Sequence, residues 1–97
     1  RAFMDWSTSF APQVGAAYWR ALGEGDLSEA ARITTEIERP LFDLAGQLDP
    51  ACGWQVLWRA ALSLKGVASH HLRLPQSTAT PAQIERVKAA LEKLGLA

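Results

Sequence analysis

Two adjacent histidines, His70 and His71, are the residues of this sequence best suited to bind a metal or exchange a proton near neutral pH. Adjacent side chains of an extended chain point to opposite sides, so one metal ion rarely takes both of them. The closest carboxylates in the sequence are Asp49 and Glu85, so no neighbouring residue completes the ligand set that a zinc site requires. We therefore expect surface or interface histidines and no metal site.

Cys52 and Lys65 are the candidate nucleophiles. Cys52 lies near a predicted helix N-terminus, where a thiol can become reactive, but no base accompanies it, and a half-buried apolar contact is the expected role. Lys65 could in principle form a Schiff base. It lies in the last turn of a predicted helix, where a cation meets the negative end of the helix dipole, and this role is the expected one. We assign no catalytic residue to this chain.

Asp5, Trp6, Ser7 and Thr8 lie at the end of a segment, Ala2–Trp6, that we predict to be a strand. In an α/β barrel the C-terminal ends of the strands face the active site. If the strand belongs to such a barrel, these four side chains are candidates for substrate binding. Trp6 has the alternative of packing against the flanking helix.

The length and composition indicate one small domain with a balanced net charge. The chain has 97 residues, 48% of them hydrophobic, with 10 basic and 10 acidic side chains. The balanced charge argues against nucleic acid and anionic membrane as partners, and no apolar run approaches the roughly 20 residues that span a bilayer. The single cysteine permits no internal disulfide and suits a cytoplasmic location.

The first half of the chain has the signals of two successive helices. Pro12 suits a first helical position and Gly25 a helix end, which predicts a helix over Pro12–Glu24. Asp26 caps the next helix, whose apolar residues recur at threes and fours as far as Leu48. Pro40 lies inside that pattern and predicts a kink or break between residues 37 and 40.

The second half reads as two further helices. Asp49 is the predicted cap of a helix that ends at Gly66 and carries the apolar face Trp54, Leu57, Trp58 and Ala61. That face suits a core, or a partner surface if it is exposed. Residues 67–79 have no helical period. Thr80 and Gln83 then form a capping box for a helix that closes at Gly95.

The order of these elements, one strand and then four helices, indicates an incomplete domain that is itself mainly α. A lone strand does not satisfy its own backbone groups. The alternative is a free-standing helical module that binds a partner protein or dimerises through its Trp-rich face.

Several ordered motifs carry a family resemblance. They are LRLP at Leu72–Pro75, TATP at Thr78–Pro81 with the closing VKAALEKLGLA, the helix start at Gly25-Asp26, RPLFDL at Arg39–Leu44, and the opening AFMDWSTSFAP. Together they run along nearly the whole chain. The sequence resembles the C-terminal region of the dihydrodipicolinate synthase/N-acetylneuraminate lyase family.

The resemblance implies an α/β fold, a (β/α)8 TIM barrel. Residues 1–25 would be the last β/α unit and residues 26–97 a C-terminal three-helix extension. The family comprises aldolases, synthases and dehydratases that bind pyruvate or another 2-oxo acid through a lysine Schiff base, in some cases with an aldehyde, without a separate cofactor. That lysine would lie upstream of Arg1, so no catalytic residue carries over. A homotetramer is the family's common assembly and the expected one.

The opening segment departs from the family pattern. Family members often have a small residue and an asparagine near the end of the last strand, where this chain has Trp6 and Ser9. A bulky Trp6 would make that side of a pocket narrower and less polar. The departure leaves room for a less polar aldehyde or a sugar-acid derivative as substrate.

Overall fold

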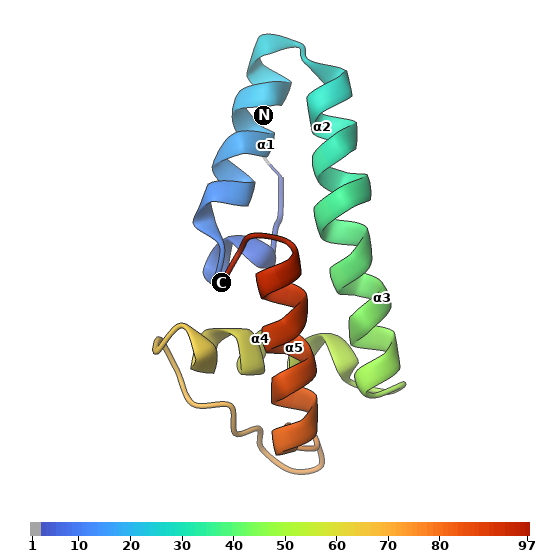
Figure 1. The fold of residues 1–97 in the computed structure, drawn as a ribbon, viewed down its shortest axis with the longest axis vertical. Coiled ribbons are helices and arrows are strands. Elements are labelled where there is room, and N and C mark those ends of the chain that lie inside the picture. The colour runs from blue at the N-terminus through green and yellow to red at the C-terminus, as the bar shows by residue number, and fades with distance from the viewer. Residues whose placement is uncertain (1–2) are drawn as a thin grey trace.

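Helices account for nearly all the regular structure in residues 3–97, which the computed structural model describes. Its elements are the 3-10 turn η1 (Ser7–Ser9), α1 (Pro12–Glu24), α2 (Leu27–Ile33), the π-helical turn η2 (Thr34–Glu38), α3 (Arg39–Leu48), α4 (Gly53–Leu64) and α5 (Pro81–Lys93). Helices α1 and α2 form a hairpin, and α2, η2 and α3 follow one another as a single long rod (Figure 1). Helix α4 crosses the rod at its α3 end, and α5 packs on α4 (Figure 1).

The hairpin turn has the predicted local causes. Gly25 ends α1 with a left-handed backbone (φ 72°) that other residues adopt at a cost. The side chain of Asp26 accepts a hydrogen bond of 3.0 Å from the backbone N–H of Glu29, which caps α2. The predicted helix over Pro12–Glu24 and the cap at Asp26 are confirmed.

Pro40 neither breaks nor ends the rod. The turn before it widens to a π-helix, in which the N–H of Arg39 bonds to the carbonyl of Thr34, five residues back. Pro40 has no N–H to donate, and the wider turn moves the preceding carbonyl groups away from its ring. The irregularity lies where we predicted a kink or break, but its form is a bulge within a continuous helix.

The predicted strand is not formed. Phe3, Met4 and Asp5 have no regular secondary structure, Trp6 is in a bend, and η1 follows at once; Ala2 lies outside the described residues. A strand needs a second strand to pair with, and residues 3–97 contain none. The mainly α character of the chain is confirmed.

The start of α4 was also predicted wrongly. Asp49 does accept hydrogen bonds from the N–H groups of Ala51 (2.8 Å) and Cys52 (3.1 Å), but these bonds shape a turn. The helix begins at Gly53. Gly53 is buried against α3, where an added Cβ would overlap the carbonyl oxygen of Ala45. The helices approach too closely there for a side chain at residue 53, and the helix starts only after the turn that Asp49 holds.

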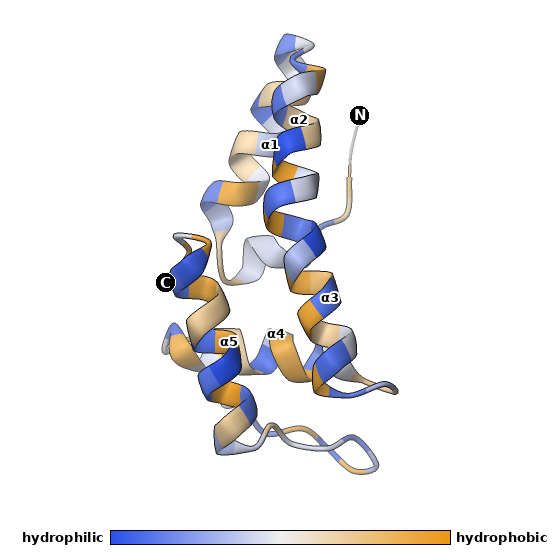
Figure 2. Ribbon diagram, turned by 45° about the vertical axis from the view of Figure 1, so that its right-hand side comes forward, coloured by the Kyte–Doolittle hydropathy of each residue, from blue (hydrophilic) through white to orange (hydrophobic). Residues whose placement is uncertain are grey.

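The apolar core lies mainly where α3, α4 and α5 meet. Hydrophobic and hydrophilic residues alternate along these helices (Figure 2), and their buried hydrophobic residues belong to one cluster. Leu41, Leu57, Val87 and Leu91 are at most 1% exposed. On α4 the buried face is shifted from the predicted one: Val56 and Ala60 are buried, whereas Trp54 is 45% exposed.

The predicted capping box of α5 is confirmed. Thr80 accepts a hydrogen bond from the N–H of Gln83 (3.2 Å), and the Gln83 side chain accepts one from the N–H of Thr80 (2.8 Å). Gln83 also donates to the carbonyl of Leu48 (2.9 Å), so the cap ties α5 to the end of α3. Gly95 follows α5 with φ 72° and closes it.

Candidate functional site

The polar residues of the opening segment gather around one buried hydroxyl group. The side chain of Ser7 is fully buried. Its Oγ lies 2.7 Å from Oδ1 of Asp5 and 2.5 Å from Oε1 of Glu38, which belongs to η2, 31 residues further along the chain. We call Asp5, Ser7 and Glu38 the acid–serine cluster. It joins the opening segment to the long rod.

Asp5 organises the turn that carries Ser7. Besides the Ser7 hydroxyl, it accepts hydrogen bonds from the Ser7 backbone N–H (2.9 Å) and from the Thr8 hydroxyl. These bonds satisfy a donor at the start of η1 in the way a helix cap does. Gly15 of α1 leaves the space for them, because an added Cβ there would overlap the Thr8 hydroxyl.

Glu38 is the electrostatically unusual member of the cluster. Its pKa lies above the ordinary value of 4.5, first because burial disfavours the charged form. The hydrogen bond with Ser7 opposes this shift, and the negative charge of Asp5 adds to it. A raised pKa favours the neutral acid, which can donate a hydrogen bond.

An open apolar cavity of about 360 Å³ adjoins the cluster. Asp5 and Glu38 supply its carboxyl groups, and most of the remaining lining is apolar: Phe3, Met4, Trp6, Val14, Tyr18, Ile33 and Phe42. A second cavity of about 410 Å³ shares Met4, Asp5, Trp6 and Phe42 with the first and is lined also by Trp54 and Trp58. Trp6 therefore lines both cavities.

Trp6 packs against two other aromatic rings, neither of which is on the helix that directly follows the opening segment. Its ring makes edge-to-face contacts with Phe10 and Phe42, each at 5.7 Å between ring centres. Phe42 is on α3, so these contacts hold the opening segment against the rod. The same ring lines both cavities, and its effect on the width of a substrate pocket stays a prediction.

The chemistry of this arrangement is acidic and apolar. No basic side chain is among the residues that line either cavity. A 2-oxo acid is an anion, and its carboxylate would lack a positive partner here. The prediction that Asp5, Trp6, Ser7 and Thr8 contact substrate stays a prediction, and within it Trp6 would contribute shape and the other three hydrogen bonds.

The sequence of this chain is similar to that of a curated protein. Over 86 residues the chain is 35% identical to a 4-hydroxy-tetrahydrodipicolinate synthase of Corynebacterium aurimucosum. The match covers 89% of this chain but only 27% of that synthase, so the chain spans about a quarter of the relative's length. It is consistent with a C-terminal fragment of a protein of that family. No protein-family model and no solved structure matches the chain.

The other candidate residues do not form a site. The rings of His70 and His71 stack at 4.5 Å, so our expectation that they point to opposite sides was wrong. Within residues 3–97, no three His, Cys, Asp or Glu residues gather as a metal-binding group. Cys52 is half-buried against the core, as predicted, and the Lys65 ammonium donates to the carbonyl of Leu96.

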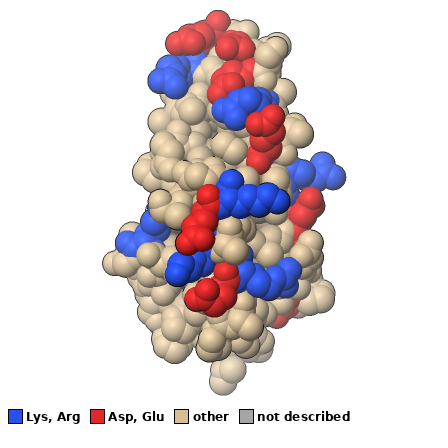
Figure 3. Space-filling view, in the orientation of Figure 1, with Lys and Arg blue, Asp and Glu red and all other residues tan. Residues whose placement is uncertain are grey.

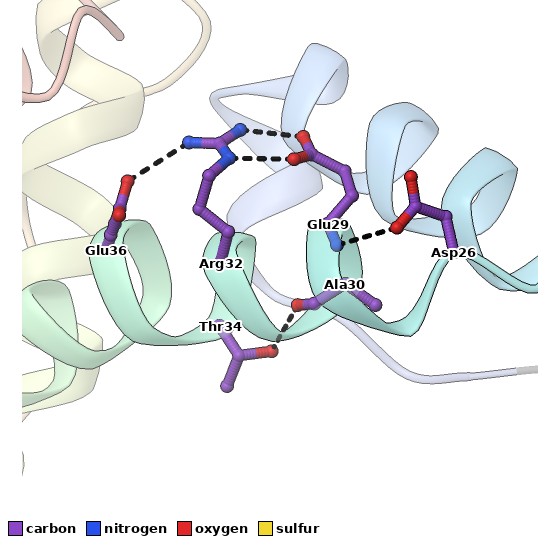
Figure 4. A network of polar contacts seen from close by, with 6 residues as sticks. All are labelled: Asp26, Glu29, Ala30, Arg32, Thr34 and Glu36. Atoms are coloured by element: carbon purple, nitrogen blue, oxygen red, sulfur yellow. Dashed lines mark hydrogen bonds and ion pairs between the residues drawn. The ribbon is translucent and has the colours of Figure 1, made fainter.

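The charged surface is mixed in sign. Lys, Arg, Asp and Glu side chains alternate over the face drawn in Figure 3. On α2 and η2, Arg32 bonds Glu29 at 2.7 Å and Glu36 at 3.2 Å, beside the Asp26 cap (Figure 4). No helix within residues 3–97 has the length and apolar character needed to cross a bilayer.

Sequence reasoning missed Glu38. Its neighbours Ile37 and Leu41 fit the apolar stripe, and nothing in the spacing distinguishes Glu38 from an exposed glutamate. Its position depends on the π-helical turn, which rotates the residues that follow it relative to an α-helix. No sequence signal links Glu38 to Ser7.

Proposed function

We propose that this chain is the C-terminal part of a lyase that acts on pyruvate or another 2-oxo acid through a lysine Schiff base upstream of the segment. The observation that carries the proposal is the 35% identity to a synthase over 89% of the chain. In this proposal residues 1–25 are the last β/α unit of a (β/α)8 barrel, and residues 26–97 are a helical extension. The full-length protein is an enzyme, and this segment supplies none of its catalytic groups.

Two features of the fold support a larger protein around the segment. The opening residues 3–5 have no regular secondary structure and no strand partner in the part of the chain described. Met4 among them is fully exposed, and Phe42 and Trp54 are 58% and 45% exposed. A neighbouring strand would satisfy the backbone, and apolar side chains of the barrel would cover the aromatic rings.

The direct test is borohydride trapping with the full-length protein. Incubation with pyruvate and borohydride should add one pyruvyl group, reduced to a stable amine, to a lysine upstream of Arg1, as located by peptide mass spectrometry. Omission of pyruvate is the control. Absence of an adduct would refute the mechanism for a pyruvate-type substrate.

The second candidate is a helical module that binds a protein partner. It is favoured by the Trp54 and Trp58 rings, which stack at 5.8 Å and line an apolar cavity. Residues 1–97 expressed alone discriminate the two. A cooperative, monomeric fold with a near-UV tryptophan signal favours the module, whereas a molten or aggregating chain favours the fragment.

The proposal extends to assembly and substrate shape. We expect a homo-oligomer, in the family's case a tetramer, in the cytoplasm, with small-molecule 2-oxo acid and aldehyde partners. Trp6→Ala should widen the cavity beside Asp5, and in the full-length enzyme it should improve kcat/KM for bulkier aldehydes relative to smaller ones. An unchanged preference between bulkier and smaller aldehydes would show that the opening segment is not part of the substrate site.

A further inference from the structure

The Ser7 hydroxyl makes two close oxygen contacts in the acid–serine cluster. Both cannot be hydrogen bonds if Asp5 and Glu38 are ionised. Ser7 Oγ lies 2.7 Å from Asp5 and 2.5 Å from Glu38, both within the range of O–H···O hydrogen bonds. A serine hydroxyl has one hydrogen and can donate to only one of these acceptors. The other contact therefore needs a hydrogen that a carboxylic acid supplies.

The proton belongs on Glu38. The Asp5 carboxylate already accepts the Ser7 N–H and the Thr8 hydroxyl, and these donors favour its ionised form. Glu38 is half-buried, and the Ser7 hydroxyl is its hydrogen-bond partner in this structure. The consistent arrangement is Glu38 donating to Ser7, and Ser7 donating to Asp5.

Few charged groups surround this chain of hydrogen bonds. Asp5 faces Glu38 from the opening segment, and Tyr18 of α1 lines the same cavity. Arg39, the next residue, lies 3.6 Å from Asp43 on the exposed side of α3. From α4 only the Trp54 and Trp58 rings reach the adjoining cavity. No cation in this set compensates a second negative charge.

We propose that the Glu38–Ser7–Asp5 chain is a proton-dependent latch, which fastens the opening segment and η1 to the long rod while Glu38 is neutral. When Glu38 releases its proton to solvent, its contact with Ser7 loses a hydrogen and two negative charges share one buried hydroxyl. The latch then weakens, and the opening segment separates more readily from η2. This inference does not depend on the proposed lyase function.

The sign follows from proton linkage. The pKa of Glu38 is raised in the latched state, so the latched state holds the proton more strongly than the open state. The latch is fully stable below pH 4.5, the ordinary value for this carboxyl group. Its stability falls as pH rises from there to the raised pKa, and it changes no further above that value.

Hydrogen exchange measured by mass spectrometry on the full-length protein tests the latch. Exchange of peptides covering residues 3–11 is followed from pH 5 to pH 8 and divided by the intrinsic chemical rate. In the wild type the opening constant should rise by up to about tenfold per pH unit, then level off. Peptides from α4 and α5 report any global unfolding.

Glu38→Gln is the decisive variant, because its amide donates to Ser7 at every pH, as the neutral acid does. Its opening constant should be low and independent of pH, whereas the control Glu24→Gln, on the exposed end of α1, should match the wild type. A pH-independent wild type, or the same slope in wild type and Glu38→Gln, would overturn the proposal. If Glu38→Gln unfolds globally, Asp5→Asn serves as the test instead. Loss of the Asp5 charge should bring the pKa of Glu38 closer to its ordinary value, so the opening constant should depend on pH over a narrower range.

Discussion

The interactions that hold α3, α4 and α5 together differ from those that attach the opening segment. The three helices meet in an apolar core, with Leu57 and Val87 fully buried and the Thr80–Gln83 cap fastened to α3. The opening segment has no strand partner among the described residues and is attached through the Trp6 ring and the acid–serine cluster. The core is covered by this chain itself, while the opening segment leaves apolar side chains exposed.

The difference separates two kinds of stability. The stability that comes from apolar burial is almost independent of pH. A substitution in the core lowers it by leaving a cavity or by forcing atoms to overlap. A buried polar cluster depends on every donor having its acceptor and on the protonation of its acids. The variants below should therefore affect the two regions unequally.

Gly53→Ala should have the largest effect. The added methyl group overlaps the Ala45 carbonyl oxygen, so α3 and α4 must move apart, at a cost of about 3 kcal/mol in unfolding free energy. Gly46→Ala is the matched control on α3, because its Cβ meets open space and the change should stabilise by up to about 1 kcal/mol. Urea denaturation measures both. Equal effects would mean that α3 and α4 are not in close contact.

Ser7→Ala should cost about 2 kcal/mol in unfolding free energy, because it removes the hydroxyl that links the two carboxyl groups and leaves each of them without this hydrogen-bond partner. The loss should appear as faster exchange in residues 3–11, with α5 unchanged. Ser28→Ala, at an exposed position on α2, serves as the control. Equal protection of the two variants would show that the hydroxyl does not fasten the opening segment.

Thr80→Ala should cost about 1 kcal/mol, the usual value of a lost N-cap, and should fray the first turn of α5. Ser77→Ala, in the loop before it, is the control. Thermal unfolding followed by circular dichroism measures the change. A cost near zero would show that Gln83 alone, through Leu48, holds the helix start.

Arg32→Ala should have the smallest effect on the free energy of unfolding, because the Arg32 and Glu29 side chains are 46% and 38% exposed and solvent screens their ion pair. Added salt should reduce the difference further, since exposed ion pairs are screened. A comparison of unfolding midpoints at low and high salt tests this. A large, salt-independent loss would indicate that Arg32 has a packing role.

Sequence reasoning succeeded where the cause of a structure is local. Gly25 and the Thr80–Gln83 box fixed helix ends because each acts within a few residues of itself. It failed at Asp49, whose cap-like bonds shape a turn, and at the opening strand, which needs a partner strand. It located the irregularity before Pro40 but not its π-helical form.

The sequence by itself determined the order of the helices, most of their ends and the capping box of α5, because these depend on spacing and short-range hydrogen bonds. Only the tertiary structure decided that Glu38 meets Ser7 and that Gly53 must lack a side chain. Both depend on how α3 and η2 pack against segments distant in sequence. The identity of a residue does not reveal which distant group lies within hydrogen-bond distance or van der Waals contact of it.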